Sequence, residues 1–270
     1  KVMINDEKDA VYIYSLEYKK GTKGIEQIGF IGLMGLEPEG TSKVLPHENT
    51  LAAPKEDRLS LMRTMKANLS PIFVLYEDKT HGLTKILKKF ISKDKALINI
   101  RSNNVRHRVW PLEDKNVIKK IDHIMANRDI FIADGHHRYE VSCTYCKETQ
   151  GAANYMMVYF VEMDERMLTI LPAHRIVKDI GGLNKEEILG KLNGYFHVDK
   201  MQGLKALLRK MKRPAKSHIF GMYLGKKDYY LLRLKSIKES DEAIKNKPQP
   251  WKALDVSILH QFIIQHLLGI

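Results

Sequence analysis

In the stretch RDIFIADGHHRYEVSCTYCKE, residues 128–148, an apolar run ends at an Asp-Gly pair and two histidines and an arginine follow directly. Its apolar run at residues 130–132 predicts the end of a buried strand, and Asp134-Gly135 predicts a tight turn. The following residues, from His136 to about Glu148, predict a helix. The segment is therefore expected to form a strand, a turn and a helix in direct succession.

Three side chains that can carry positive charge follow this turn directly. His136, His137 and Arg138 fall in the first turn of the predicted helix, where backbone N–H groups and the positive end of the helix dipole face outward. A helix start of this kind binds anions, and a guanidinium adds a planar fork of donors. We therefore predict a phosphate-binding cradle made by residues 134–138.

Two other interpretations of the triplet are open. Adjacent helical residues point about 100° apart, so His136 and His137 do not chelate one ion, whereas His136 and Glu140 share a face. A closed zinc site would also need Cys143 and Cys146, and one C-x-x-C without a second pair is weak evidence for it. The third interpretation is a polar start of a surface helix without a function.

Composition sets the general class of the protein. The chain has 270 residues, 44% of them hydrophobic, and a formal net charge of +13. This charge favours acidic partners, but the lysines are scattered and lack the interleaved aromatics of a single-strand nucleic-acid track, so nucleic acid is the less favoured partner. Two cysteines fit a reducing cytoplasm, and no apolar run is long enough for a membrane span.

Alternating and helical patterns follow each other without a strict βαβ repeat, which predicts an α+β fold with a mixed sheet. Glycines near residue 181 predict a boundary between a core at residues 1–180 and a small α+β subdomain at residues 181–270. In that subdomain a hairpin with the turn GKKD, residues 225–228, precedes an amphipathic helix at residues 253–268 that returns to pack. The abrupt start suggests that the N-terminus is truncated.

Further candidates lie upstream of the turn motif. Phosphoryl transfer needs a carboxylate base, cations for the phosphate oxygens and usually Mg²⁺. Glu48, in a loop beside His47, is the predicted base. Asp57 could serve as a base or hold metal, and the alternative for it is helix capping. Arg58 beside it and Asn68 in the turn after the helix complete the set, and the favoured alternative for Asn68 is an ordinary helix stop and turn. No metal site is fixed, although Asp57 or Glu140 could hold Mg²⁺.

A second basic pair follows a later predicted strand, residues 168–177. His174 and Arg175 could meet the same cleft as the cradle, or could form an ordinary strand-edge salt bridge. We interpret His81, His107 and His123 as surface or packing residues. The chain has no Walker A loop, no G-x-G-x-x-G and no G-x-S-x-G, which argues against the common nucleotide and hydrolase scaffolds.

Five motifs in fixed order carry a family resemblance. They are HENT, KEDRLSLMRTMKANLSPIFVLY, HRVW, IFIADGHHRYE and LPAHRIV, and they run through most of residues 11–178. In this order they resemble the domain-of-unknown-function family ten-fifteen, and the helix near the end resembles the helix that follows in that family.

The DGHHR element in turn is similar to the phosphate-binding signature of the ParB and sulfiredoxin superfamily. The resemblance implies a ParB/sulfiredoxin-like core in which His136, His137 and Arg138 contact the phosphates of a nucleotide or of pyrophosphate, while a glutamate activates the acceptor. The two-histidine form looks most like the free-serine kinases. Glu48 and His137 would then be catalytic, and Mg²⁺ with ATP, ADP or pyrophosphate would be required.

Two alternatives belong to the same superfamily. One is a nucleotide-dependent nucleic-acid-binding or regulatory module of the ParB type. The net charge of +13 fits this alternative, but the sequence lacks a helix-turn-helix signature, which argues against it. The other is sulfiredoxin-like repair, which needs a catalytic cysteine, whereas Cys143 lies about two helical turns past the cradle. The sequence thus favours a small-molecule phosphotransferase.

Overall fold

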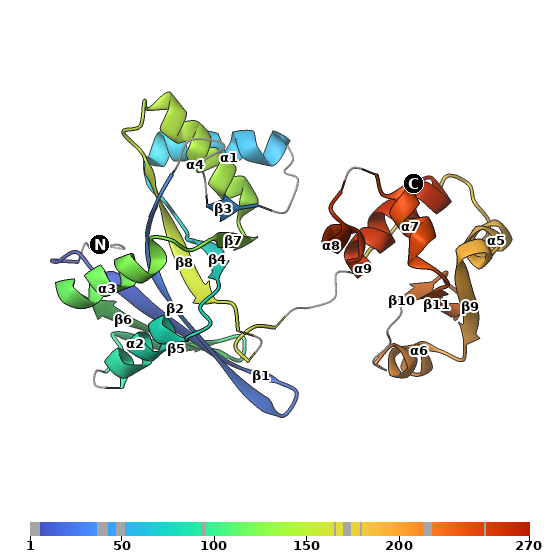
Figure 1. The fold of residues 1–270 in the computed structure, drawn as a ribbon, viewed down its shortest axis with the longest axis horizontal. Helices are drawn as coiled ribbons and strands as arrows, with labels where there is room; N and C mark the ends of the chain where they lie inside the picture. Colours follow the sequence, from blue (N-terminus) through green and yellow to red (C-terminus); the bar gives the residue numbers. More distant parts are fainter. Residues whose placement is uncertain are drawn as a thin grey trace. The chain divides into compact units, whose positions relative to one another are not determined.

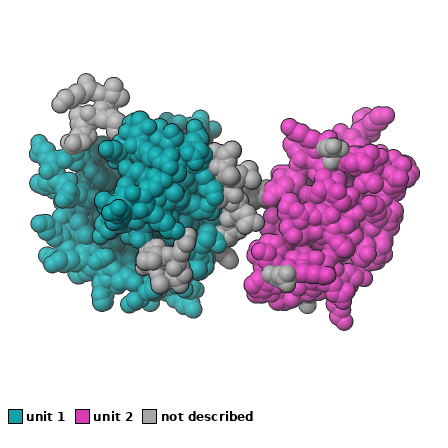
Figure 2. All heavy atoms as spheres, turned by 90° about the horizontal axis from the view of Figure 1, so that it is seen from above, with its two compact units in different colours: residues 1–170 teal, residues 171–270 magenta. Residues whose placement is uncertain are grey.

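A computed structural model describes residues 6–36, 43–46, 52–92, 95–164, 166–169, 174–178, 180–212, 218–245 and 247–270, without the side chains of 52–54. The chain divides into two compact units, residues 1–170 and 171–270 (Figure 2). Each unit has its own cluster of buried apolar side chains. No helix among the described residues combines the length and the apolar character that a membrane crossing requires.

Within the described part of the first unit, eight strands form one mixed sheet in the order β3-β7-β4-β8-β2-β1-β6-β5. β3 pairs with β7 and β4 with β8 in parallel, while the other neighbours are antiparallel. The predicted α+β class with a mixed sheet is confirmed. The strands are β1 (Val11–Lys20), β2 (Lys23–Gly35), β3 (Val44–Leu45), β4 (Ile72–Tyr76), β5 (Ile98–Ser102), β6 (Val105–Leu112), β7 (Ile130–Asp134) and β8 (Tyr155–Glu162).

Four helices accompany this sheet in the described residues: α1 (Ala52–Met65), α2 (Gly82–Ile91), α3 (Lys115–Met125) and α4 (His136–Glu148). α1 and α4 lie side by side (Figure 1). Lys55 pairs with Glu140 at 2.9 Å and Arg63 with Glu148 at 2.6 Å. Both pairs are 85 positions apart in the sequence, so the two helices run parallel and begin at the same end.

The central strands β4 and β8 hold the core of this unit. In β4 the side chains of Ile72, Val74 and Tyr76, which share one face of the strand, are at most 1% exposed, while the residues between them are partly buried. The neighbouring β8 is buried along most of its length, and a continuous apolar run of this kind is typical of a strand covered on both sides. By contrast, the edge strand β5 is exposed throughout.

The second unit contains a three-stranded antiparallel sheet among its described residues, in the order β10-β11-β9. The predicted hairpin is confirmed, with Gly225, Lys226 and Lys227 at positive φ in its turn. The predicted amphipathic helix forms a short turn followed by a π-helix, whose Phe262 packs in the core of this unit. The elements are α5 (Lys185–Tyr195), β9 (Phe196–Met201), α6 (Leu204–Met211), β10 (Ile219–Tyr223), β11 (Tyr229–Leu234), α7 (Ile237–Ala243), α8 (Gln249–Lys252), α9 (Asp255–Ser257) and η1 (Ile258–Leu268).

One predicted strand is wrong in its described part. Residues 168–169 and 174–177 form neither strand nor helix. Ile176 is 89% exposed, so its apolar side chain does not alternate into a sheet as the pattern suggested. The two cysteines behave as predicted for helix-face residues, since both lie partly buried on α4 and form no disulfide.

Candidate functional site

The predicted strand, turn and helix at residues 130–148 is present with nearly the predicted bounds. β7 ends at Asp134, α4 begins at His136, and Gly135 joins them with φ of 101° and ψ of 27°. A Cβ at Gly135 would lie 2.7 Å from Cγ2 of the buried Ile72. Both the left-handed backbone and the close neighbour therefore require glycine at this position.

Arg138 fixes the turn against the segment before β4. Its Nη2 donates to Oδ2 of Asp134 at 2.7 Å, and its Nη1 donates to Oγ of Ser70 at 2.9 Å and to the carbonyl of Pro71 at 2.6 Å. The guanidinium thus joins the end of β7, the start of α4 and the start of β4. Asp134, which is largely exposed, orients this cation.

The two histidines occupy different environments. His136 is only 2% exposed, whereas His137 is partly buried. The triplet therefore presents Arg138 and one imidazole near the surface, and the other imidazole points into the protein. The β-bulge at Phe73 and Val74, opposite the end of β7, adjusts the strand at this point.

Arg138 also lines a cavity of about 120 Å³ between α1, α4 and the loop that precedes β4. Arg58 and Asn68, two of the predicted candidates, line the same cavity. So does Ser142, which is 4% exposed and whose Oγ has no hydrogen-bond partner in the described part of the chain. The cavity is thus apolar with two guanidinium groups and a few polar atoms in its wall.

The remaining predicted site residues are not gathered there by the described structure. His47 and Glu48 lie outside the described residues. Asp57 is exposed on α1, and Glu140, the other predicted Mg²⁺ ligand, pairs with Lys55. His174 and Arg175 are exposed in the unit formed by residues 171–270, so their meeting with the cradle stays a prediction.

The family comparison agrees with the motifs. A family model described as "Protein of unknown function (DUF1015)" matches residues 1–257, which is nearly the whole chain. The chain belongs to the DUF1015 family. The predicted family resemblance is confirmed, and the match extends beyond the motif region into the second unit. No curated protein and no solved structure matches this chain significantly.

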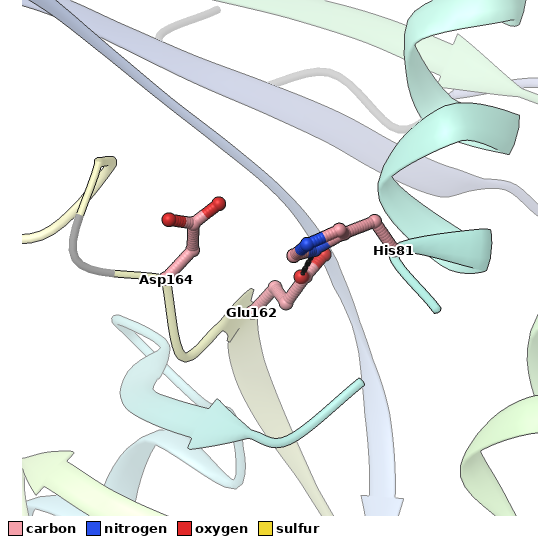
Figure 3. A group of neighbouring side chains, drawn as sticks. All are labelled: His81, Glu162 and Asp164. Carbon is pink, nitrogen blue, oxygen red and sulfur yellow. Dashed lines mark hydrogen bonds and ion pairs between the residues drawn. The ribbon is translucent and has the colours of Figure 1, made fainter. Parts of the chain in front are cut away.

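The DUF1015 chain has a second polar cluster that sequence reasoning missed. The ligand atoms of His81, Glu162 and Asp164 all lie within 4.8 Å of one another (Figure 3). His81 precedes α2 with φ of 54°, and the two acidic residues end and follow β8. Our interpretation of His81 as a surface or packing residue was therefore incomplete, because it contacts a buried carboxylate.

Glu162 is the buried centre of this cluster in the DUF1015 chain. It is 1% exposed, and its two oxygens accept hydrogen bonds from the imidazole of His81 and the hydroxyl of Thr84. Burial raises the pKa of the nearby Tyr76 phenol, and the charge of Glu162 raises it further. Hydrogen bonds from Arg166 lower the pKa of Asp164.

A sequence signal for the second cluster does exist. Two buried strands, β4 and β8, each run directly into acidic residues, in YEDKTH and in VEMDER. When such strands lie parallel and adjacent, these acidic residues meet at one edge of the sheet. The sequence pattern shows the acidic ends, but it does not show that β4 and β8 are neighbours.

Proposed function

We propose that this DUF1015 chain is a phosphotransferase with a ParB/sulfiredoxin-like core, which transfers phosphate from ATP, ADP or pyrophosphate to free L-serine or a similar small hydroxy amino acid. The observation that supports this proposal most directly is the β7–α4 turn, where Gly135 opens α4 and Arg138 is held beside the helix start. The proposal assigns the oxyanion of the phosphate donor to this turn.

The turn has the properties of an oxyanion site. α4 is 13 residues long, and its N-cap is a glycine that offers no side-chain acceptor to the first-turn N–H groups. A helix start of this kind is complementary to a phosphate oxygen because the N–H groups and the dipole act together. His137 and Arg138 add donors at the same place, and charge-assisted hydrogen bonds are the stronger ones.

The neighbouring cavity suits the acceptor. An engineered cavity of about 150 Å³ holds benzene, so the cavity of about 120 Å³ suits a molecule of a few heavy atoms such as serine. The Arg58 guanidinium would bind the acceptor carboxylate through its fork of donors, with Asn68 and Ser142 as further polar partners. Arg138 lines both the turn and the cavity, which would bring donor and acceptor together.

Glu48 remains the proposed base. β3, which ends two residues before His47, runs parallel to β7, so both strands end toward the same edge of the sheet. α1, which begins four residues after Glu48, starts at the same end as α4. A carboxylate on the segment between these two elements would accept the proton of the serine hydroxyl, and Mg²⁺ would accompany the donor phosphates.

Phosphorus NMR tests the proposal directly. With L-serine, Mg²⁺ and each of the three donors in turn, we expect a new phosphomonoester signal from the unchanged protein. His137→Ala should abolish this signal, whereas His123→Ala, at an exposed position on α3, should leave it unchanged. Absence of a phosphomonoester with every donor would refute the proposal.

Arg58→Lys provides a second measurement. A lysine retains the charge but loses the bidentate geometry, so the KM for serine should rise while the KM for the donor stays the same. If the variant instead raised the KM for the donor alone, the assignment of the cavity to the acceptor would be wrong.

A further inference from the structure

The second polar cluster arises from the way β4 and β8 end. The two strands are parallel neighbours with Tyr76 opposite Glu162, and the N–H of Met163 donates to the carbonyl of Tyr76 at 2.8 Å. The chain that leaves β4 then reaches His81 at the start of α2, and the chain that leaves β8 reaches Asp164. Polar groups from both segments therefore gather at one edge of the sheet, where parallel α/β proteins bind their ligands.

The three side chains form a set of ligands suited to a metal ion. They offer one imidazole nitrogen and two carboxylates, all within 4.8 Å of one another. Bonds of about 2.0 to 2.2 Å to one ion separate ligand atoms by about 3 to 3.5 Å. The limit of 4.8 Å exceeds this separation by about 1 to 2 Å. Side-chain rotations of that size would bring all three ligand atoms onto one ion.

Burial distinguishes this cluster from ordinary surface acidic groups. The side chains of Glu162 and Asp164 are 1% and 10% exposed. Two carboxylates so far from water need a compensating positive charge. Thr84, which donates to the second oxygen of Glu162, is the kind of outer partner that orients a metal-binding carboxylate.

Arg166 supplies this positive charge, and it does so from outside. Its guanidinium donates to both oxygens of Asp164 at 2.6 to 3.0 Å and lies 3.4 Å from Nε2 of His81. Its own side chain is 71% exposed. A long, exposed cation of this kind can move into solvent at little cost, which would leave Asp164 available as a ligand.

We propose that His81, Glu162 and Asp164 (Figure 3) bind a divalent transition metal, and that Arg166 leaves Asp164 when the ion enters. The imidazole ligand favours Zn²⁺ over Ca²⁺ and Mg²⁺, which prefer all-oxygen sites, and the two carboxylates also suit Mn²⁺. Three protein ligands leave further coordination positions for water or for a ligand with oxygen donors. This site is separate from the β7–α4 turn and does not depend on the proposed function.

Titration of the unchanged protein with Mn²⁺, followed by electron paramagnetic resonance, tests the proposal. We expect one saturable Mn²⁺ that Zn²⁺ displaces. Asp164→Asn and His81→Asn should each weaken the affinity at least tenfold. Asparagine is chosen at position 81 because it tolerates the left-handed backbone there.

Arg166→Gln provides the decisive comparison. If Arg166 competes with the ion, the variant should bind Mn²⁺ several-fold more tightly than the unchanged protein. Asp199→Asn, which disrupts an exposed ion pair with Arg233 in the other unit, should leave the affinity unchanged.

The alternative is a salt-bridge network that stabilises the fold and binds no metal. It predicts no saturable Mn²⁺ or Zn²⁺ binding, or equal affinity in the unchanged protein and in Asp164→Asn, and either result would overturn the proposal. Unchanged or weaker binding in Arg166→Gln would overturn the role of Arg166. These measurements contain no phosphate donor or serine, so their outcome is independent of the phosphotransferase test.

Discussion

Gly135→Ala should destabilise the first unit by more than the conformational strain of the turn alone. The residue has φ of 101°, a region that costs an L-residue about 1 to 2 kcal/mol. In addition, the new methyl group would lie 2.7 Å from Cγ2 of Ile72 and 3.0 Å from Nη2 of Arg138. Ile72 is fully buried and cannot move aside freely, so overpacking adds about 1 to 3 kcal/mol. The expected loss is therefore about 2 to 5 kcal/mol in the free energy of unfolding.

Gly151→Ala is the matched control in the same unit. Gly151 lies just after α4 with φ of 84°, but a Cβ there would meet nothing within 4 Å. It should therefore lose only the strain of about 1 to 2 kcal/mol. Urea unfolding is followed by tryptophan fluorescence in a Trp251→Phe background. The signal then reports on the first unit alone, because the remaining tryptophan, Trp110, is 3% exposed in that unit.

The difference in free energy of unfolding between the two variants measures the cost of close packing at the turn. If Gly135→Ala and Gly151→Ala lose the same free energy of unfolding to within about 0.5 kcal/mol, the contact with Ile72 does not restrict the residue at position 135. A larger loss for Gly135→Ala alone supports the packing argument. It would also predict weaker phosphate binding by any Gly135→Ala protein that remains folded, because the methyl group would displace Arg138.

Two further predictions concern ionisation. Burial tends to raise the pKa of Asp78, but hydrogen bonds from Thr80 and from the backbone N–H of Leu83 outweigh it and lower this pKa. The Asp78 carboxylate should thus stabilise the protein above its unfolded pKa, and this contribution should be lost as the pH falls through the lower folded pKa. Asp78→Asn should therefore make Tm fall less steeply on acidification. An unchanged dependence of Tm on acidic pH would contradict this prediction. Burial raises the pKa of Tyr76 and Tyr159, so both phenols should ionise only on unfolding in an alkaline absorbance titration, and Tyr159→Phe should remove one late-ionising group.

Most of the fold could be predicted from local patterns because they reflect local physics. The apolar run before Asp134-Gly135 and the helical residues after it gave the bounds of α4, and the GKKD turn gave the β10–β11 hairpin. The strand expected at residues 168–177 is wrong in its described part, residues 168–169 and 174–177, because short apolar runs outside a sheet have the same pattern as strands. Ile176 is apolar, but no pairing partner is present in the described residues to give it a buried face.

The order of strands in the sheet could not be predicted from these patterns. β4 and β8 are separated in the sequence by more than 75 residues and by three other strands of the same sheet, yet they pair in parallel. The pairing alone brings His81 to Glu162 and Asp164, which is why the second cluster was missed. Arg58, by contrast, lies within α1 and Asn68 lies three residues after its end, so the local sequence alone was enough to select both as candidates.

The two sites occupy opposite ends of one strand. Ser70, which binds Arg138, precedes β4, whereas His81 follows it, and the five residues of β4 span about 16 Å at the usual rise per residue. Changes separated by more than about 10 Å without shared partners usually have additive effects. We therefore expect Arg138→Ala to leave the Mn²⁺ affinity unchanged, and Asp164→Asn to leave serine phosphorylation unchanged. If the double variant instead lost more Mn²⁺ affinity or more serine phosphorylation than the two single variants together, β4 would couple the two ends. The metal would then belong to the phosphotransferase mechanism.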